Sequence, residues 1–95
     1  MIVSKEKYKE LKRIAESKLR AYPYHKFSDK NDKSVEFIEF VMERLDETSK
    51  EIIKMSYFID DVPKNKILND LNISNACYYR KKRRALEKFI IGLSY

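Results

Sequence analysis

The scarcity of glycine and proline is the feature that most restricts how this chain can fold. One Gly and two Pro occur in 95 residues, whereas average usage would give roughly seven Gly and five Pro. Tight turns between β-strands depend on such residues, so the sequence argues against an all-β sandwich or barrel. Apolar residues instead recur at three- and four-residue intervals, which indicates amphipathic helices. We therefore predict one small all-α domain of four to five helices.

The first third of the chain predicts one amphipathic helix followed by a loop. Apolar side chains recur at helical spacing from Tyr8 onward, and Ser4 is a good candidate for the N-cap. Pro23 is expected to end the helix, because it has no N–H and disfavours helical geometry at the residue before it. Residues 23–33 show no periodicity and are expected to form a connecting loop. We assign residues 1–33 to this helix and loop.

Three further helices are expected in the middle of the chain. The first covers residues 34–46, where apolar side chains again follow a helical spacing. The segment Thr48-Ser-Lys-Glu51 matches a capping box, which predicts the start of the second helix. The third is short and ends at Leu71, and Pro63 suits its first position.

A helix-turn-helix is predicted at the C-terminal end. Asn72 follows the short helix at the place where a left-handed residue often closes a helix. Ser74 is a strong N-cap candidate for a last helix. Two helices joined by about three residues, the second of them basic, are the outline of a helix-turn-helix. We assign residues 34–95 to this helical domain, which is expected to form one compact unit with residues 1–33.

The excess positive charge lies entirely in the C-terminal part of the chain. The net charge is +6. Residues 1–61 hold 13 basic and 13 acidic side chains, whereas residues 62–95 hold eight basic and two acidic ones. This asymmetry indicates a polyanionic partner, either nucleic acid or a membrane surface. The basic helix lacks the broad apolar face that membrane-surface helices bury, so we expect double-stranded DNA as the partner and no membrane.

The last helix separates apolar from basic side chains. At about 100° per residue, Tyr78, Ala85 and Phe89 fall on one side, which is expected to face the core. Lys81 and Lys82 lie near the edge of that apolar side, where their stems can pack while their ammonium groups reach solvent. The remaining surface of the helix is therefore the part expected to meet DNA.

The expected DNA contacts form two groups. Asparagine pairs with adenine and alanine contacts the methyl group of thymine, so residues near the helix start are suited to base edges in the major groove. These base-reading candidates are Asn75, Ala76 and Tyr79. Cations and a helix N-terminus are suited to phosphates. The backbone-contact candidates are Lys64, Lys66, Ser74, Arg80, Arg83 and Arg84.

Part of this region resembles a family of phage regulators. The residues that carry the resemblance are Ile73-Ser74, Tyr78-Tyr79-Arg80-x-Lys82 and Ala85-Leu86. They are similar to the Ser, Tyr-Tyr-Arg and Ala-Leu signature of the ArpU and RinA type of phage transcriptional regulators. Those proteins in turn resemble region 4 of sigma factors, the helix-turn-helix that reads the −35 promoter element. The similarity covers residues 34–91.

The resemblance implies a phage or prophage regulator, an activator of late or morphogenetic genes in a Gram-positive host. Carried over to this sequence, it implies base reading by Asn75, Ala76 and Tyr79 and backbone contacts by Arg80 and Arg83. The N-terminal helix has no counterpart in the resemblance. A dimer arm, a partner site and a simple cover for the core all remain open for it, and so does a homodimer.

No catalytic residue, metal site or cofactor is expected. His25 is the only histidine, and Cys77 has no second Cys or His at motif distance. Asp60-Asp61 is interpreted as a polar turn. A single cysteine favours a reducing compartment, and the first residues lack the apolar segment of a secretory signal. We therefore expect a cytoplasmic protein that is not an enzyme.

A protein-interaction module is the alternative interpretation. Such a module would dock on RNA polymerase or a repressor without reading DNA itself. The terminal apolar residues could serve this role or close the core, and the core is the favoured interpretation. These residues are Phe89, Ile90, Ile91, Leu93 and Tyr95.

Overall fold

The computed structural model describes residues 4–27 and 33–93, and these residues form an all-α fold. Its helices are α1 (Lys5–Lys26), α2 (Lys33–Arg44), α3 (Glu47–Ile53), α4 (Lys64–Leu71) and α5 (Asn75–Leu93). A π-helical segment, Lys54–Phe58, continues α3. The prediction of an all-α fold with four to five helices is confirmed, and α4 and α5 are the two helices of the predicted helix-turn-helix.

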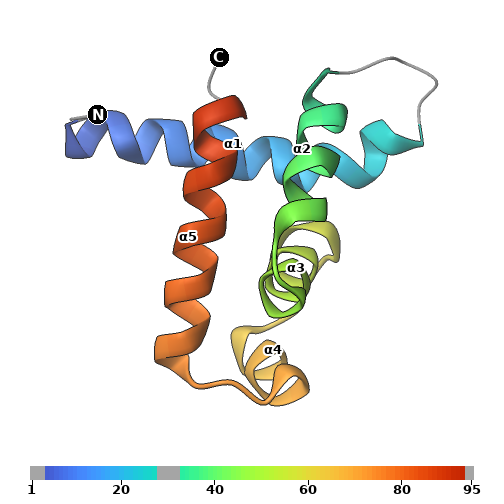
Figure 1. Cartoon of the computed structure of the whole chain (residues 1–95), viewed down its shortest axis with the longest axis vertical. Coiled ribbons are helices and arrows are strands. Elements are labelled where there is room, and N and C mark those ends of the chain that lie inside the picture. The colour runs from blue at the N-terminus through green and yellow to red at the C-terminus, as the bar shows by residue number, and fades with distance from the viewer. Residues whose placement is uncertain (1–3, 28–32, 94–95) are drawn as a thin grey trace.

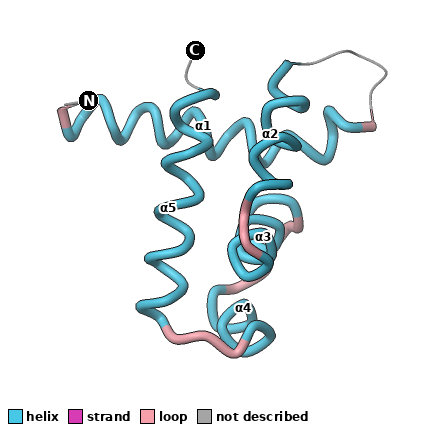
Figure 2. Tube along the Cα trace, viewed as in Figure 1, coloured by secondary structure: helices cyan, strands magenta, loops and turns pink. Residues whose placement is uncertain are grey.

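The helices are arranged around α5, which runs almost the whole length of the molecule. Figure 1 shows α2 standing beside the upper part of α5, and α1 crossing both at a steep angle. α3 and α4 lie toward the other end of α5, and a short loop joins α4 to the start of α5 (Figure 2). The start of α5 therefore lies away from α2, while α1 and α2 pack against its second half.

Two hydrophobic cores hold this arrangement together. The main core unites α1, α2, α3 and the second half of α5, and Phe89 and Leu19 are fully buried in it. The small core lies between α3, α4 and the first half of α5, and its buried members are Ile52, Ile67 and Tyr78. Tyr78 is 4% exposed, which confirms its predicted place on the core side of the last helix.

Three predicted helix caps are confirmed. The hydroxyl of Ser4 accepts a hydrogen bond from the backbone N–H of Lys7 at 3.1 Å, so one of the unpaired donors at the start of α1 is satisfied. Ser74 caps α5 in the same way, with Cys77 N–H as donor at 3.1 Å. Asn72 closes α4 in the left-handed conformation, with φ 53° and ψ 51°.

The expectation that Pro23 ends the first helix is wrong. α1 continues through Pro23 to Lys26. Proline has no N–H to bond to the carbonyl four residues earlier, but the last turn makes two contacts with other elements. The ring of Tyr22 packs on Phe58 with 4.7 Å between centroids, and Lys26 pairs with Glu39 at 3.4 Å.

The start of α3 also differs from the prediction. Asp46, rather than Thr48, is the N-cap, and its carboxylate accepts the backbone N–H of Ser49 at 3.1 Å. The Ser49 hydroxyl donates to the same carboxylate at 2.7 Å. Because these two bonds, both donated by Ser49, cap the helix two residues earlier than predicted, the Thr48-Ser-Lys-Glu51 segment lies inside α3. The start of α4 also differs from the prediction by one position, because Pro63 is its N-cap and Lys64 its first residue.

The terminal apolar residues divide between core and surface. Phe89, Ile90 and Leu93 are buried in the main core, as favoured from the sequence, whereas Ile91 is 64% exposed. Tyr95 and part of the predicted loop, residues 28–32, lie outside the described residues. No helix in the described part of the chain has a stretch long and apolar enough to cross a membrane.

Candidate nucleic-acid interface

The turn between α4 and α5 fixes how the last helix is presented. The backbone N–H of Ile73 bonds to the carbonyl of Leu68 at 3.1 Å, and that of Asn72 bonds to Asn69 at 3.3 Å. Together with the left-handed residue, these bonds end α4 in a Schellman-type cap. Ile73 and Leu71 then pack against the small core. The direction of α5 relative to α4 is therefore set by both backbone bonds and apolar contacts.

The base-reading candidates lie on the exposed surface at the start of α5. Asn75 and Ala76 are exposed, and Tyr79 is 55% exposed. The Tyr79 hydroxyl accepts a hydrogen bond from the Nζ atom of Lys64 at 3.0 Å. This bond, with the charge of the ammonium group, lowers the pKa of the Tyr79 hydroxyl. The ring of Tyr79 also meets that of Tyr78 edge-on, with 5.1 Å between centroids.

The backbone-contact candidates differ in how free their charges are. Arg80 and Arg84 are exposed, and neither forms an ion pair with a residue that the structure describes. The Nε atom of Arg83 lies 3.4 Å from a carboxylate oxygen of Glu87 on the same helix. Ion pairs this exposed contribute little, so the guanidinium of Arg83 stays available to a phosphate.

The three backbone-contact candidates from α4 and the following turn, Lys64, Lys66 and Ser74, have different partners. Lys64 reaches across to α5, where its Nζ atom bonds to Tyr79, one of the base-reading candidates. Lys66 instead pairs with Asp70 at 3.1 Å along α4. Ser74 is exposed, and its hydroxyl is engaged as the N-cap of α5.

The remaining two cations of the basic run, Lys81 and Lys82, are half-buried at the edge of the apolar side, as predicted. The expectation that their ammonium groups reach solvent is wrong, because both bond to other side chains of the protein. The Nζ atom of Lys81 bonds to the carboxylate of Asp46 at 3.1 Å. That of Lys82 bonds to the Tyr78 hydroxyl at 3.1 Å and lies 5.3 Å from the ring centroids of Tyr78 and Tyr57. Hydrogen bonds from Ser49, followed by the contact with Lys81, hold the pKa of Asp46 well below its usual range.

A contribution from α1 escaped the sequence-based prediction. Tyr8 and Lys12 line a groove together with side chains of α5, next to the base-reading group. The net charge did not point to α1, because the basic and acidic side chains of residues 1–61 are equal in number. Only the crossing of α1 over α5 brings these residues together.

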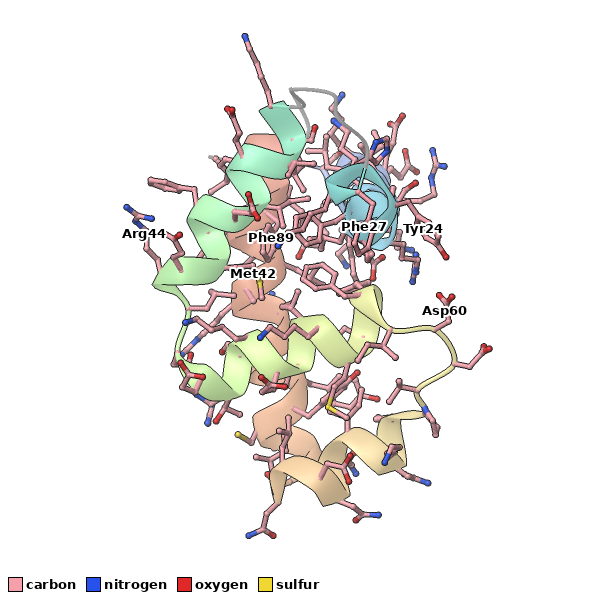
Figure 3. All side chains as sticks on the ribbon, turned by 90° about the vertical axis from the view of Figure 1, so that its right-hand side faces the viewer. Tyr24, Phe27, Met42, Arg44, Asp60 and Phe89 are labelled. Carbon is pink, nitrogen blue, oxygen red and sulfur yellow. The ribbon has the colours of Figure 1, made fainter. Side chains whose placement is uncertain are left out.

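A second surface exposes apolar side chains on the opposite side of the molecule. Figure 3 looks onto it and shows Met42 on α2 and Phe27 and Tyr24 at the end of α1, with α5 and Phe89 behind. Phe27 is 89% and Tyr24 69% exposed. A groove of about 520 Å³ runs between α1, α2 and the π-helical segment. It is lined by Tyr22, Lys26, Glu39, Met42, Glu43, Lys54, Phe58 and Ile59.

Neither surface gathers metal ligands. Among the described residues, no three His, Cys, Asp or Glu side chains come together in a way that could hold a metal ion. Cys77 is half-buried on α5.

Comparison with known proteins identifies one family. A family model described as "Protein of unknown function (DUF1492)" matches residues 26–89. The match includes α2, α3, α4 and most of α5, and it leaves nearly all of α1 outside. No curated protein and no solved structure matches the chain.

Proposed function

The chain belongs to the DUF1492 family, and we propose that it is a transcriptional regulator of phage or prophage type that binds double-stranded DNA in a sequence-specific manner. α5 is the recognition helix in this proposal. Its first two turns enter the major groove, where Asn75, Ala76 and Tyr79 meet base edges. We further propose that the chain activates late or morphogenetic genes in the cytoplasm of a Gram-positive host. The resemblance to ArpU and RinA regulators supports this role.

One observation carries the proposal. The first half of α5 is anchored by Tyr78 in the small core, yet its other side is exposed and bears Tyr79, Arg80 and Arg83. Direct base readout requires a helix that is rigid on one side and free on the other, because a side chain selects a base only when its backbone is fixed. The basic side chains supply the sequence-independent affinity for phosphates that every such complex needs.

The proposal is tested by selecting preferred sequences from a pool of duplexes with a randomised centre. The full chain should bind the selected duplex more tightly than a random duplex, and log K should fall with log salt by about 0.9 per phosphate contact. Arg80→Ala should weaken binding to both duplexes by about fivefold at physiological salt, because one such contact is lost. Lys88→Ala is the matched control, since Lys88 is an exposed cation on the second half of α5.

Two results would contradict this function. One is equal affinity for the selected duplex, a random duplex and heparin, which would mean that the chain responds only to polyanions. The other is an equal loss of DNA affinity in Arg80→Ala and Lys88→Ala, which would mean that the first half of α5 does not form the interface.

A protein-interaction module is the second candidate function, and the exposed apolar surface beside α2 favours it. Ile59 is 54% exposed at the rim of the groove there, and exposed apolar patches with a polar rim are typical of protein interfaces. RNA polymerase or a repressor would be the partner. Ile59→Glu should then abolish binding to purified, nuclease-treated RNA polymerase or repressor and leave DNA affinity unchanged. Unaltered binding by this variant would exclude the groove as the docking site.

A further inference from the structure

A basic groove lies in the corner where α1 crosses α5. Figure 1 shows the N-terminal half of α1 extending past α5 on the side away from α2. The groove has a volume of about 310 Å³. It is lined by Tyr8 and Lys12 of α1 and by Tyr79, Lys82, Arg83 and Leu86 of α5. None of these six residues is acidic.

The groove concentrates positive charge from two distant parts of the sequence. Lys12 and Arg83 approach it from different helices, and Lys82 adds a third cation. Within the described residues, Lys12 forms no ion pair with a carboxylate. Two carboxylates lie nearby: Glu16, which accepts a hydrogen bond from the Tyr57 hydroxyl at 2.6 Å, and Glu87, which pairs with Arg83 at 3.4 Å. Neither of them lines the groove. Like charges that converge in a concave site favour an anionic occupant.

The basic side of α1 continues beyond the groove. At about 100° per residue, Lys5 lies within roughly 20° and Lys9 within roughly 60° of Lys12 around the helix. Both are exposed. Lys12, Lys9 and Lys5 are each about one helical turn apart. They therefore form a row of cations on α1 that starts at the groove and extends away from α5.

The distance to the base-reading group matches the dimensions of DNA. Arg83 follows Ala76 by seven residues and Tyr79 by four, so it lies about 10 Å and about 6 Å further along the axis of α5 than these two base-reading candidates. The major groove is about 12 Å wide. A helix whose start contacts base edges therefore passes a sugar-phosphate strand about where the corner with α1 begins.

We propose that the groove between α1 and α5 holds one phosphate strand of the DNA duplex, so that α1 is a second DNA-binding element. This inference depends on the proposed function. Lys12 and Arg83 contact phosphates inside the groove, and Lys9 and Lys5 contact the phosphates that follow. The aromatic rings of Tyr8 and Tyr79 form its walls. α1 thereby acquires a role that none of the interpretations of the sequence gave it.

The test measures the salt dependence of binding to a fluorescent duplex of random sequence with the full chain. Lys12→Gln removes the charge but keeps much of the aliphatic stem. We expect about a fivefold loss of affinity at physiological salt and a decrease of about 0.9 in the slope of log K against log salt. The preference for the selected duplex over the random duplex should stay unchanged, because phosphate contacts carry no sequence information.

Lys7→Gln is the matched control. Lys7 is an exposed lysine of the same helix, and it lies roughly 140° around the axis from Lys12. Equal affinity and slope for Lys12→Gln and Lys7→Gln would overturn the role of the groove. If Arg80→Ala still weakens binding in that case, the proposed function stands and only this inference fails. If the unmodified chain does not bind the duplex at all, both fail.

Discussion

The Nζ atom of Lys64 donates a hydrogen bond of 3.0 Å to the hydroxyl of Tyr79, and its charge lies 5.1 Å from the centre of the tyrosine ring. This contact joins the start of α4 to the exposed side of α5. It means that a backbone-contact candidate and a base-reading candidate from two helices form one unit. In the proposed complex, Lys64 therefore positions Tyr79 and at the same time presents a positive charge to the neighbouring phosphate strand.

Removal of the Lys64 charge should raise the pKa of Tyr79. The hydrogen bond and the positive charge of Lys64 favour the phenolate, and they lower the pKa of Tyr79 in the folded chain. In Lys64→Met the ultraviolet titration of Tyr79 should move to higher pH, with Tyr79→Phe used to assign the signal. An unchanged titration would show that the two side chains do not interact in solution.

Asp46 should contribute stability that depends on pH. Its folded pKa is lowered by Ser49 and Lys81, so the unfolded chain binds the proton more tightly. The contribution is therefore complete above the unfolded pKa of about 3.9. It is lost as the pH falls through the lower folded pKa. Urea unfolding should show a steeper acid loss of stability for the unmodified chain than for Asp46→Asn, which cannot titrate.

At neutral pH, two substitutions of Asp46 distinguish its role as a helix cap from the effect of its charge. Asp46→Ala removes the N-cap of α3 and should lower the free energy of unfolding by about 0.5–2 kcal/mol. Asparagine is also a good N-cap, so Asp46→Asn should cost less than Asp46→Ala. Equal losses in the two variants would mean that the charge pair with Lys81, rather than the cap, stabilises this helix start.

Gly92 is required by the packing of α2 on α5. A Cβ atom at this position would overlap the ring of Phe37. Gly92→Ala should therefore destabilise the fold by about 1–3 kcal/mol through overpacking, offset in part by about 1 kcal/mol of better helix propensity. In a Phe37→Ala background the same change should be neutral or stabilising. Equal effects in both backgrounds, measured by urea unfolding, would contradict the contact.

Local signals in the sequence predicted much of the fold. Ser4, Asn72 and Ser74 each act within a few residues, through a side chain or a left-handed backbone that satisfies nearby groups, and all three were predicted correctly. Tyr78 was assigned to the core because periodicity on a single helix decides which side is buried.

Contacts between distant segments account for the errors. α1 continues past Pro23 because Tyr22 packs on Phe58, a residue 36 positions away, and no local rule includes that contact. The π-helical turn, closed by the Ile59 N–H bond to the Lys54 carbonyl at 3.2 Å, was also not predicted, because the apolar spacing there was interpreted as ordinary α-helix. Lys12 was missed because the groove exists only where two helices cross.

The base preference of the full chain, determined by selection from randomised duplexes for the unmodified protein and for Asn75→Ala, tests the central claim most directly. If the first turns of α5 read base edges, the unmodified chain should select a defined sequence. Asn75→Ala should then lose the preference at one position, with about 1–3 kcal/mol less discrimination there. Identical selected sequences for both proteins, or no selected sequence for either, would contradict the account.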